Sequence, residues 1–359
     1  MGAGTLPLSA LDRAGWARPP DGGPAVEVPA RLRALVSPDG EARAAAWHWW
    51  ETWFLGGHEQ PALARAVPFL LGLLADGGTP DRERALGGLS RLVERPPGAD
   101  GPGPGGPVRA AVIAGVPALV PLLEAADVRT AGAAAELLAW LPERAREVLP
   151  ALRGLCARAG PGPERATALI ALGTLAGTPA GSAADRAVLE GALRGGPDPD
   201  RWAAAVGLCR AAAPAPPTGV VVPLVTELAA AHRDPDGYPA VRRTRFHDDD
   251  VAGLLAATLR TLPAPCREAA GLAVSACLSA PDQRPEEADG LASALVVDAL
   301  GDLEQVAARA LTPWQRAVLG ALPGADPVWA SGELGRWLGS AYGLPGTPGA
   351  LARWCAARP

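Results

Sequence analysis

Apolar residues recur three and four positions apart along most of this chain, a spacing that places them on one face of an α-helix. The segments with this spacing are short, and clusters of Pro, Gly and Asp separate them. Many begin with an acidic residue or a proline, as the N-terminus of a helix favours. The pattern predicts helices over residues 62–74, 82–93, 108–123, 131–141, 143–159, 164–175, 201–212, 250–262 and 286–300.

Strand signals are rare by comparison. The one compact run of β-branched residues, 220–222, continues directly into a segment of Ala and Leu. Hydrophobic residues make up 48% of the chain but aromatic residues only 4%, so Ala and Leu must supply most of the buried surface. We therefore predict an all-α fold.

The helical segments also repeat. A phrase of Val or Leu followed by Pro occurs at 67–70, 116–119, 149–152 and 222–224. The first three phrases precede a second helix that opens with an arginine, Arg82, Arg129 or Arg165, and a fourth helix opens with Arg201. The last three arginines are 36 residues apart, the period of a helix-pair repeat. A helix pair cannot cover its own apolar face, so stacked neighbours must bury it, which predicts an α-α superhelix, or α-solenoid.

The breaks between segments suggest a domain organisation. We expect an extended N-terminal lead at 1–28, helix pairs at 29–95 and a flexible Pro/Gly-rich insertion at 96–107. Further helix pairs follow at 108–311, with a loop insertion at 232–249, and capping helices close the chain at 312–359.

One unit resembles a known repeat. The run Leu-Leu-Glu-Ala-Ala-Asp-Val-Arg at 122–129, followed by the apolar segment 133–141, is similar to the HEAT repeat. That repeat often carries a proline in its first helix, and an Asp followed by Val-Arg in its turn, as at Asp127, Val128 and Arg129. The resemblance implies a HEAT-like, or armadillo-like, α-solenoid.

A second resemblance covers more of the chain. Segments 11–16, 28–35 and 66–71, and the ending at 311–316 with Trp329 and 342–345, are similar to a family of uncharacterised actinobacterial HEAT-repeat proteins. The family usually carries His-Gln-Gly-Thr where this chain has Gly-His-Glu-Gln-Pro at 57–61. The resemblance implies a repeat scaffold of a kind sometimes suspected of acting as an immunity protein against a toxin.

The charged residues exclude several function classes. All 33 basic residues are arginines, so the chain has neither a P-loop lysine nor a Schiff-base lysine, and its net charge of -5 provides no broad basic field for nucleic acid. The five cysteines include no C-x-x-C pair and are expected to be small buried residues. With no apolar run long enough for a bilayer and no secretory signal pattern, we predict a cytoplasmic monomer with no cofactor and no membrane or nucleic-acid partner.

The densest aromatic patch is the first candidate site. On a helix, Trp47 and Trp50 share one face, whereas Trp49 and Trp53 share another, so one pair should be more exposed than is usual for tryptophan. Tryptophan anchors are favoured at protein interfaces, so we predict that Trp49 and Trp53 bind a partner. The alternative is that the bulky rings fill space beside alanine-rich neighbours and cap the repeat.

The loop insertion at 232–249 is the second candidate site. Long loops often carry function, and this loop holds the predicted partner-binding residues Tyr238, Arg242, Arg243, Arg245 and Phe246. Its arginines would pair with an acidic partner, while its aspartates cap the next helix. A metal site at His247 with 248–250 is a weaker alternative, because adjacent carboxylates usually mark a solvated helix start.

Other motifs add little chemistry. His58, which we include with the partner-binding residues, precedes Glu59, but the second histidine of a zincin is replaced by Ala62. The Gly-rich run at 101–106 lacks the preceding strand of a nucleotide-binding loop. The repeat arginines are expected to form ion pairs between repeats beside Asp127 and Asp200, rather than a phosphate-binding ladder.

Together these patterns predict a non-enzymatic HEAT-repeat scaffold that binds a protein partner, with toxin immunity as the most specific version. No catalytic, cofactor-binding or metal-binding residue is assigned. Two alternatives stay open: a nucleic-acid-handling enzyme on the same fold, and a hydrolase or metal enzyme that uses His58 or His247.

Overall fold

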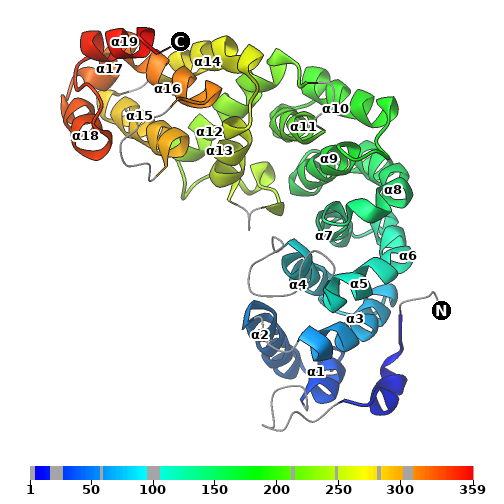
Figure 1. Cartoon of the computed structure of the whole chain (residues 1–359). Helices are drawn as coiled ribbons and strands as arrows, with labels where there is room; N and C mark the ends of the chain where they lie inside the picture. The colour runs from blue at the N-terminus through cyan, green and yellow to red at the C-terminus, as the bar shows by residue number, and fades with distance from the viewer. Residues whose placement is uncertain are drawn as a thin grey trace. The chain divides into compact units, whose positions relative to one another are not determined.

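The computed structural model describes residues 5–16, 27–56, 60–94, 106–211, 215–246, 250–280, 284–301 and 310–358. Helices make up most of these residues, and no strand occurs among them, which confirms the predicted all-α class. The chain divides into two compact units, Met1–Gly160 with Thr178–Gly181, and Pro161–Gly177 with Ser182–Pro359. Within each unit the helices pack in chain order (Figure 1).

The described residues of the first unit form eight α-helices and three short 3-10 helices. They are η1 (Leu8–Arg13), α1 (Val28–Ala34), α2 (Gly40–Gly56), α3 (Gln60–Ala75), α4 (Arg82–Glu94), α5 (Pro107–Ala114), α6 (Val116–Leu119), η3 (Val120–Glu124), α7 (Val128–Ala139), η4 (Pro142–Arg144) and α8 (Ala145–Arg158).

The second unit continues the alternation of helices and short turns. Its described elements are α9 (Pro163–Ala176), α10 (Ala183–Gly195), α11 (Asp198–Arg210), η5 (Thr218–Val220), α12 (Val221–Arg233), η6 (Ala240–Arg242), α13 (Val251–Arg260), η8 (Ala264–Cys266), α14 (Arg267–Leu278), α15 (Pro285–Leu300), α16 (Pro313–Ala321), η10 (Leu322–Gly324), α17 (Asp326–Trp329), α18 (Glu333–Tyr342) and α19 (Pro348–Ala356).

The sequence repeat corresponds to equivalent helices. Helices α7, α9 and α11 begin at residues 128, 163 and 198, which are 35 residues apart. In the second unit, α9 packs against α11 through Gly173 and Gly207, and a Cβ atom on Gly173 would lie only 2.2 Å from the Gly207 Cα. The two backbones therefore approach so closely that glycine is required at this crossing.

Helix α3 holds part of the N-terminal lead. The amide of Leu6 donates a 2.8 Å hydrogen bond to the carbonyl oxygen of Pro68, and a Cβ atom on Gly72 would lie 2.3 Å from the Leu6 oxygen. Leu11 is fully buried, and its carbonyl accepts a 2.8 Å hydrogen bond from the Trp16 indole. Residues 8–13 of the lead, expected to be extended, form the 3-10 helix η1, which packs on α1 and α3.

One predicted helix is wrong in its extent. The segment 108–123 is not a single helix but α5, α6 and η3, with a break at Gly115. Pro117 and Pro121 have no amide hydrogen to donate, so a continuous α-helical ladder cannot pass through them. A Cβ atom on Gly115 would lie 2.1 Å from a methyl carbon of Leu71, so a larger residue at the break would displace that side chain.

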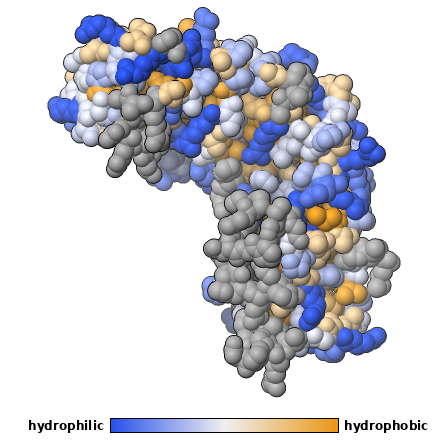
Figure 2. Space-filling view, in the orientation of Figure 1, coloured by the Kyte–Doolittle hydropathy of each residue, from blue (hydrophilic) through white to orange (hydrophobic). Residues whose placement is uncertain are grey.

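The predicted insertion at 96–107 lies outside the described residues except for Gly106 and Pro107, which open α5. Among the described residues no single helix is long and apolar enough to cross a membrane, although α5 and the helix 116–124, joined at a 51° bend, pass that test as a pair. On the face in view, hydrophilic and hydrophobic residues are interspersed over the helices of each unit (Figure 2).

Candidate binding surfaces

The aromatic patch lies on α2, and its two faces differ as expected. Trp50 is fully buried and Trp47 nearly so, whereas Trp49 is half-buried. The Trp49 ring packs edge-on against Trp50 at 5.2 Å, and the Arg31 guanidinium lies 5.6 Å from its centroid. Trp49 is thus a partly covered ring, and its role in partner binding stays a prediction.

Two predicted residues near this patch give no further information. Trp53 belongs to α2, but its side chain lies outside the described part of the molecule, and His58 lies outside the described residues altogether.

Next to the patch, Glu51 and Arg84 form two hydrogen bonds of 2.6 and 2.8 Å. These bonds to Arg84 hold the pKa of the Glu51 carboxyl below its ordinary value.

The loop insertion is organised around a buried carboxylate that is not among the predicted site residues. Glu227 of α12 is only 3% exposed, and it accepts a hydrogen bond from the Tyr238 hydroxyl and a 2.8 Å bond from Arg242. Burial, together with the hydrogen bond to Glu227, raises the pKa of Tyr238 above its ordinary value, so the phenol stays protonated and donates. A lone carboxylate within an apolar helix is the sequence signal for such a site.

Further along, the loop is anchored to α9. The hydroxyls of Thr244 and Thr167 lie 3.1 Å apart, and the amide of Arg245 donates a 3.1 Å hydrogen bond to the Thr167 hydroxyl. Phe246 is 1% exposed, and the Arg210 guanidinium lies 5.1 Å from its ring centroid. These contacts hold the loop against α9 and α11 by side chains that face inward.

The burial of Tyr238 and Phe246 differs from their predicted role. Their rings are 8% and 1% exposed, so in this structure they are anchors of the loop rather than contact surface for a partner. The arginines between them are different: Arg243 and Arg245 are half-buried, and Arg242 retains 28% of its side-chain exposure despite its bond to Glu227.

We call the outer face of this region the loop surface, and define it by Arg201, Arg242, Arg243, Arg245 and Asp198. Asp198 lies 3.6 Å from both the Arg201 and the Arg242 guanidinium groups, which joins the loop to the start of α11. Arg201 and Arg242 thus flank the exposed Asp198 carboxylate, and Arg243 and Arg245 follow Arg242 along the same loop. The loop surface as defined carries four positive charges and one negative charge.

His232, at the predicted start of the insertion, instead belongs to α12. Its Nε2 atom lies 2.6 Å from the Asp298 carboxylate of α15, whose backbone oxygen also accepts a 2.7 Å bond from Arg260. His232 therefore joins α12 to α15, while the ordered loop begins after Arg233.

Two of the four repeat arginines, Arg129 and Arg165, form ion pairs between helices, whereas Arg201 pairs with Asp198 of its own helix. Arg129 lies 3.2 Å from Glu83, and Arg165 lies 3.0 Å from the fully buried carboxylate of Asp200. Asp127 caps α7, and the hydrogen bond that its carboxylate accepts from the Thr130 hydroxyl is the main cause that lowers its pKa. The positive charge of Arg82 lowers that pKa further.

Metal-binding and nucleophilic groups are sparse in the described part of the chain. His, Cys, Asp and Glu side chains form no group of three there that could hold a metal ion. Of the residues in the metal alternative, only Asp250 is described; it caps α13 by accepting a 2.9 Å bond from the Gly253 amide. Burial raises the pKa of the Cys209 thiol to about 12, which disfavours the nucleophilic thiolate.

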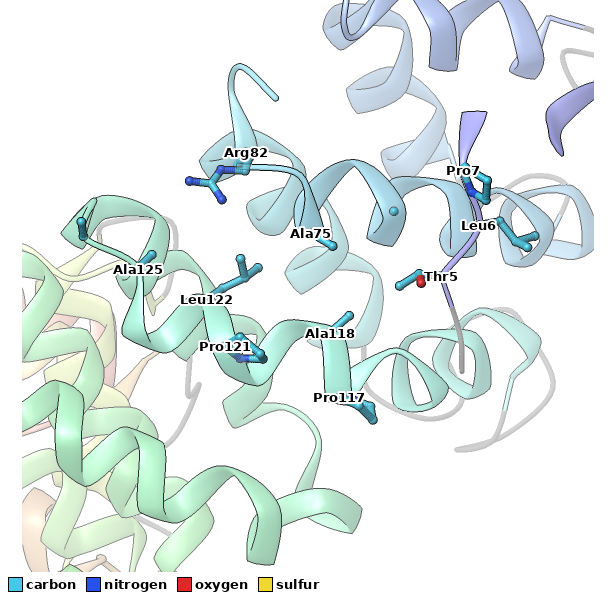
Figure 3. Close-up of a pocket in the computed structure, with 12 residues that line it drawn as sticks. Thr5, Leu6, Pro7, Ala75, Arg82, Pro117, Ala118, Pro121, Leu122 and Ala125 are labelled. Atoms are coloured by element: carbon cyan, nitrogen blue, oxygen red, sulfur yellow. The ribbon is translucent and has the colours of Figure 1, made fainter. Parts of the chain in front are cut away.

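The first unit also carries a groove of about 610 Å³ (Figure 3). Its lining comes from the N-terminal lead, α3, α4, α6 and η3, and is mostly apolar. Of the described residues that line it, Arg82 alone carries a charge. Without a carboxylate, imidazole or thiol in that lining, the groove offers contact area rather than acid–base chemistry.

Comparisons with known proteins supply no functional assignment. No family model matches the chain, and no curated protein matches it. Among solved structures it is similar to an engineered protein from the Northeast Structural Genomics Consortium, with 18% identity over 92% of this chain and 97% of that chain and a TM-score of 0.38. A second engineered protein from the same consortium has 18% identity over 76% of this chain and 96% of that chain, with a TM-score of 0.34.

Proposed function

We propose that this chain is a non-enzymatic helical scaffold of the HEAT type that binds a protein partner through the loop surface. The observation that carries the proposal is the arrangement of the loop, in which Tyr238, Thr244 and Phe246 are buried while the half-buried arginines between them keep part of their surface in solvent. Because the buried residues fix the backbone, the arginines lose less conformational freedom on binding than they would on a mobile loop.

The chemistry of the loop surface selects the kind of partner. Guanidinium groups bind carboxylates in a bidentate fashion, so we propose a protein partner with an acidic patch. The chain as a whole carries a net charge of -5, so the positive charge of the loop surface is opposite in sign to that of the whole molecule. Such a contrast guides an acidic partner to one region of an acidic protein.

Toxin immunity is the most specific form of this proposal, and it rests on the family resemblance. An immunity protein neutralises its toxin by binding, so it requires a surface rather than a catalytic group. We further propose a monomeric, cytoplasmic protein that binds neither nucleic acid nor a membrane.

A binding experiment tests the proposal. Tagged protein is used to capture partners from its native host, and the captured proteins, together with the products of genes adjacent to its own, are purified and their affinities measured. The double variant R243E/R245E should weaken the affinity for the true partner by at least about 100-fold, since two charge-assisted contacts are reversed in sign. The matched control R336E reverses an exposed arginine of α18 in the same unit, and should leave the affinity unchanged.

Equal affinity of R243E/R245E and the wild-type protein for every purified partner would refute the loop surface. Far-UV circular dichroism of both variants verifies that they retain the helical fold.

A further inference from the structure

A second hollow, separate from the loop surface, lies among the C-terminal helices of the second unit. Helices α14, α16 and α19 lie together in this unit (Figure 1), and the hollow between them has a volume of about 520 Å³. Residues of all three helices line it, together with Arg358, which follows α19.

Arginines dominate the charge of this hollow. Arg267, Arg316 and Arg358 line it, against the single carboxylate of Glu268. Within the described residues, no ion pair joins Arg267 or Arg316 to an acidic side chain, whereas Arg129, Arg165 and Arg242 each form one. The lining therefore carries three guanidinium groups and one carboxylate, an excess of positive charge.

Two of these guanidinium groups are held in position by the protein. Arg316 donates from Nε to the Leu311 carbonyl oxygen at 3.1 Å, a bond that anchors its guanidinium group. Arg358 lies 4.2 Å from the ring centroid of Trp354, a distance typical of a cation–π interaction. A positioned guanidinium loses less freedom when it binds a carboxylate.

An apolar side chain lies beside the arginines. Leu272 of α14 lines the same hollow and is 67% exposed, the highest value among the large apolar residues of the described chain. Arginine is enriched at protein interfaces, and an apolar side chain beside it adds surface that a partner can remove from water. A small inorganic anion would use the arginines but would leave Leu272 in water.

We propose that this hollow binds an acidic, leucine-bearing peptide segment of a protein. Two or more carboxylates of the segment pair with Arg267, Arg316 and Arg358, and an apolar side chain packs on Leu272. The site shares no residue with the loop surface, so it stands whether or not the loop surface binds the partner proposed above.

Fluorescence anisotropy with a defined probe tests this site. The probe is a fluorescein-labelled peptide with three repeats of Glu-Glu-Leu-Leu, and its two controls replace every Glu by Gln or every Leu by Ser. We expect saturable binding of the acidic probe, with at least tenfold weaker binding of either control. Binding should also weaken as the salt concentration rises, because the contacts are ionic.

Variants of exposed residues locate the binding on the protein. R267Q and L272S alter side chains for which no intramolecular hydrogen bond is described, so both should fold normally, and each should weaken probe binding by about tenfold. The matched control R336Q should bind as the wild-type protein does, and R243E/R245E should do so as well, which separates this site from the loop surface.

Three results would overturn the proposal. The first is equal binding of the Gln control peptide, and the second is unchanged affinity in the double variant R267Q/L272S. The third is displacement of the probe by inorganic phosphate at low millimolar concentration with no effect of L272S, which would assign the hollow to a small anion instead.

Discussion

The Arg165 guanidinium lies 3.0 Å from the Asp200 carboxylate, and this ion pair joins the first turn of α9 to the first turn of α11. Asp200 is fully buried, whereas Arg165 retains 26% of its side-chain exposure. Burial raises the pKa of Asp200, and the charge of Arg165 opposes that rise. The Asp200 carboxylate has lost its contact with water, so its negative charge is stabilised by the positive charge of Arg165.

Removal of this arginine should destabilise the second unit. We expect Arg165→Gln to lower the free energy of unfolding by about 3 kcal/mol at pH 7, because a buried charge loses its partner. Adding Asp200→Asn should restore most of that loss, since the neutral amide needs no counter-charge. Urea denaturation followed by circular dichroism measures both values. If the double variant were as unstable as the single one, the charge would not be the cause.

The same pair predicts a dependence of stability on pH. A carboxyl with a raised pKa in the folded state contributes stability that is fully present below its unfolded pKa of about 4 and is lost as the pH rises through its folded pKa. Asp200→Asn should therefore reduce the loss of stability between pH 4 and pH 7, and Arg165→Gln should enlarge it. Urea midpoints of the three proteins across this range provide the measurement, and parallel curves would contradict the assignment to Asp200.

The crossing of α9 and α11 predicts a steric effect. Gly173→Ala places a methyl group 2.2 Å from the Gly207 backbone, so the helices must separate, at a cost of about 1–3 kcal/mol. The matched control is Gly191→Ala in α10, where a Cβ atom meets nothing within 4 Å, and it should stabilise the protein by about 0.5–1 kcal/mol through helix propensity. Thermal and urea unfolding compare the two, and a stabilised Gly173 variant would show that the close approach is absent.

Docking of the N-terminal lead depends on Gly72. Gly72→Ala inserts a methyl group 2.3 Å from the Leu6 carbonyl oxygen, and should break the 2.8 Å hydrogen bond from the Leu6 amide to Pro68. Hydrogen–deuterium exchange of the Leu6 amide should then accelerate by at least about tenfold, without a comparable change in α3. Gly87→Ala in α4, where the added methyl meets nothing within 4 Å, should leave that exchange rate as it is.

The helices were predictable because their signal is local. The segments at 82–93, 164–175 and 286–300 agree with α4, α9 and α15 to within a residue or two, since apolar periodicity and helix-start residues lie in the same short window. The segment at 108–123 shows the limit of periodicity, which continues through Gly115 and Pro117 although the hydrogen-bond ladder does not.

The candidate sites were less predictable, because burial depends on distant residues. Helical spacing separates Trp49 from Trp47 and Trp50, and the structure agrees with that separation. The sequence places Tyr238 and Phe246 in a loop, but Tyr238 bonds to the buried Glu227 and Phe246 lies under the Arg210 guanidinium. Thr167, which holds the same loop, precedes its partner Thr244 by 77 residues. The hollow between α14, α16 and α19 is also not predictable from the sequence, since Arg267 and Arg316 lie on two different helices and Arg358 follows a third.

In the loop at 234–246, one set of side chains fixes the backbone conformation and a different set is proposed to contact the partner. Tyr238, Thr244 and Phe246 are buried and maintain the backbone conformation, whereas Arg243 and Arg245 are half-buried. Substitutions at 243 and 245 can therefore change what the loop recognises at little expense to folding. Related chains would be free to diversify these two positions rapidly while retaining the tyrosine, threonine and phenylalanine, and a designer could randomise the same two positions to obtain new binding specificities.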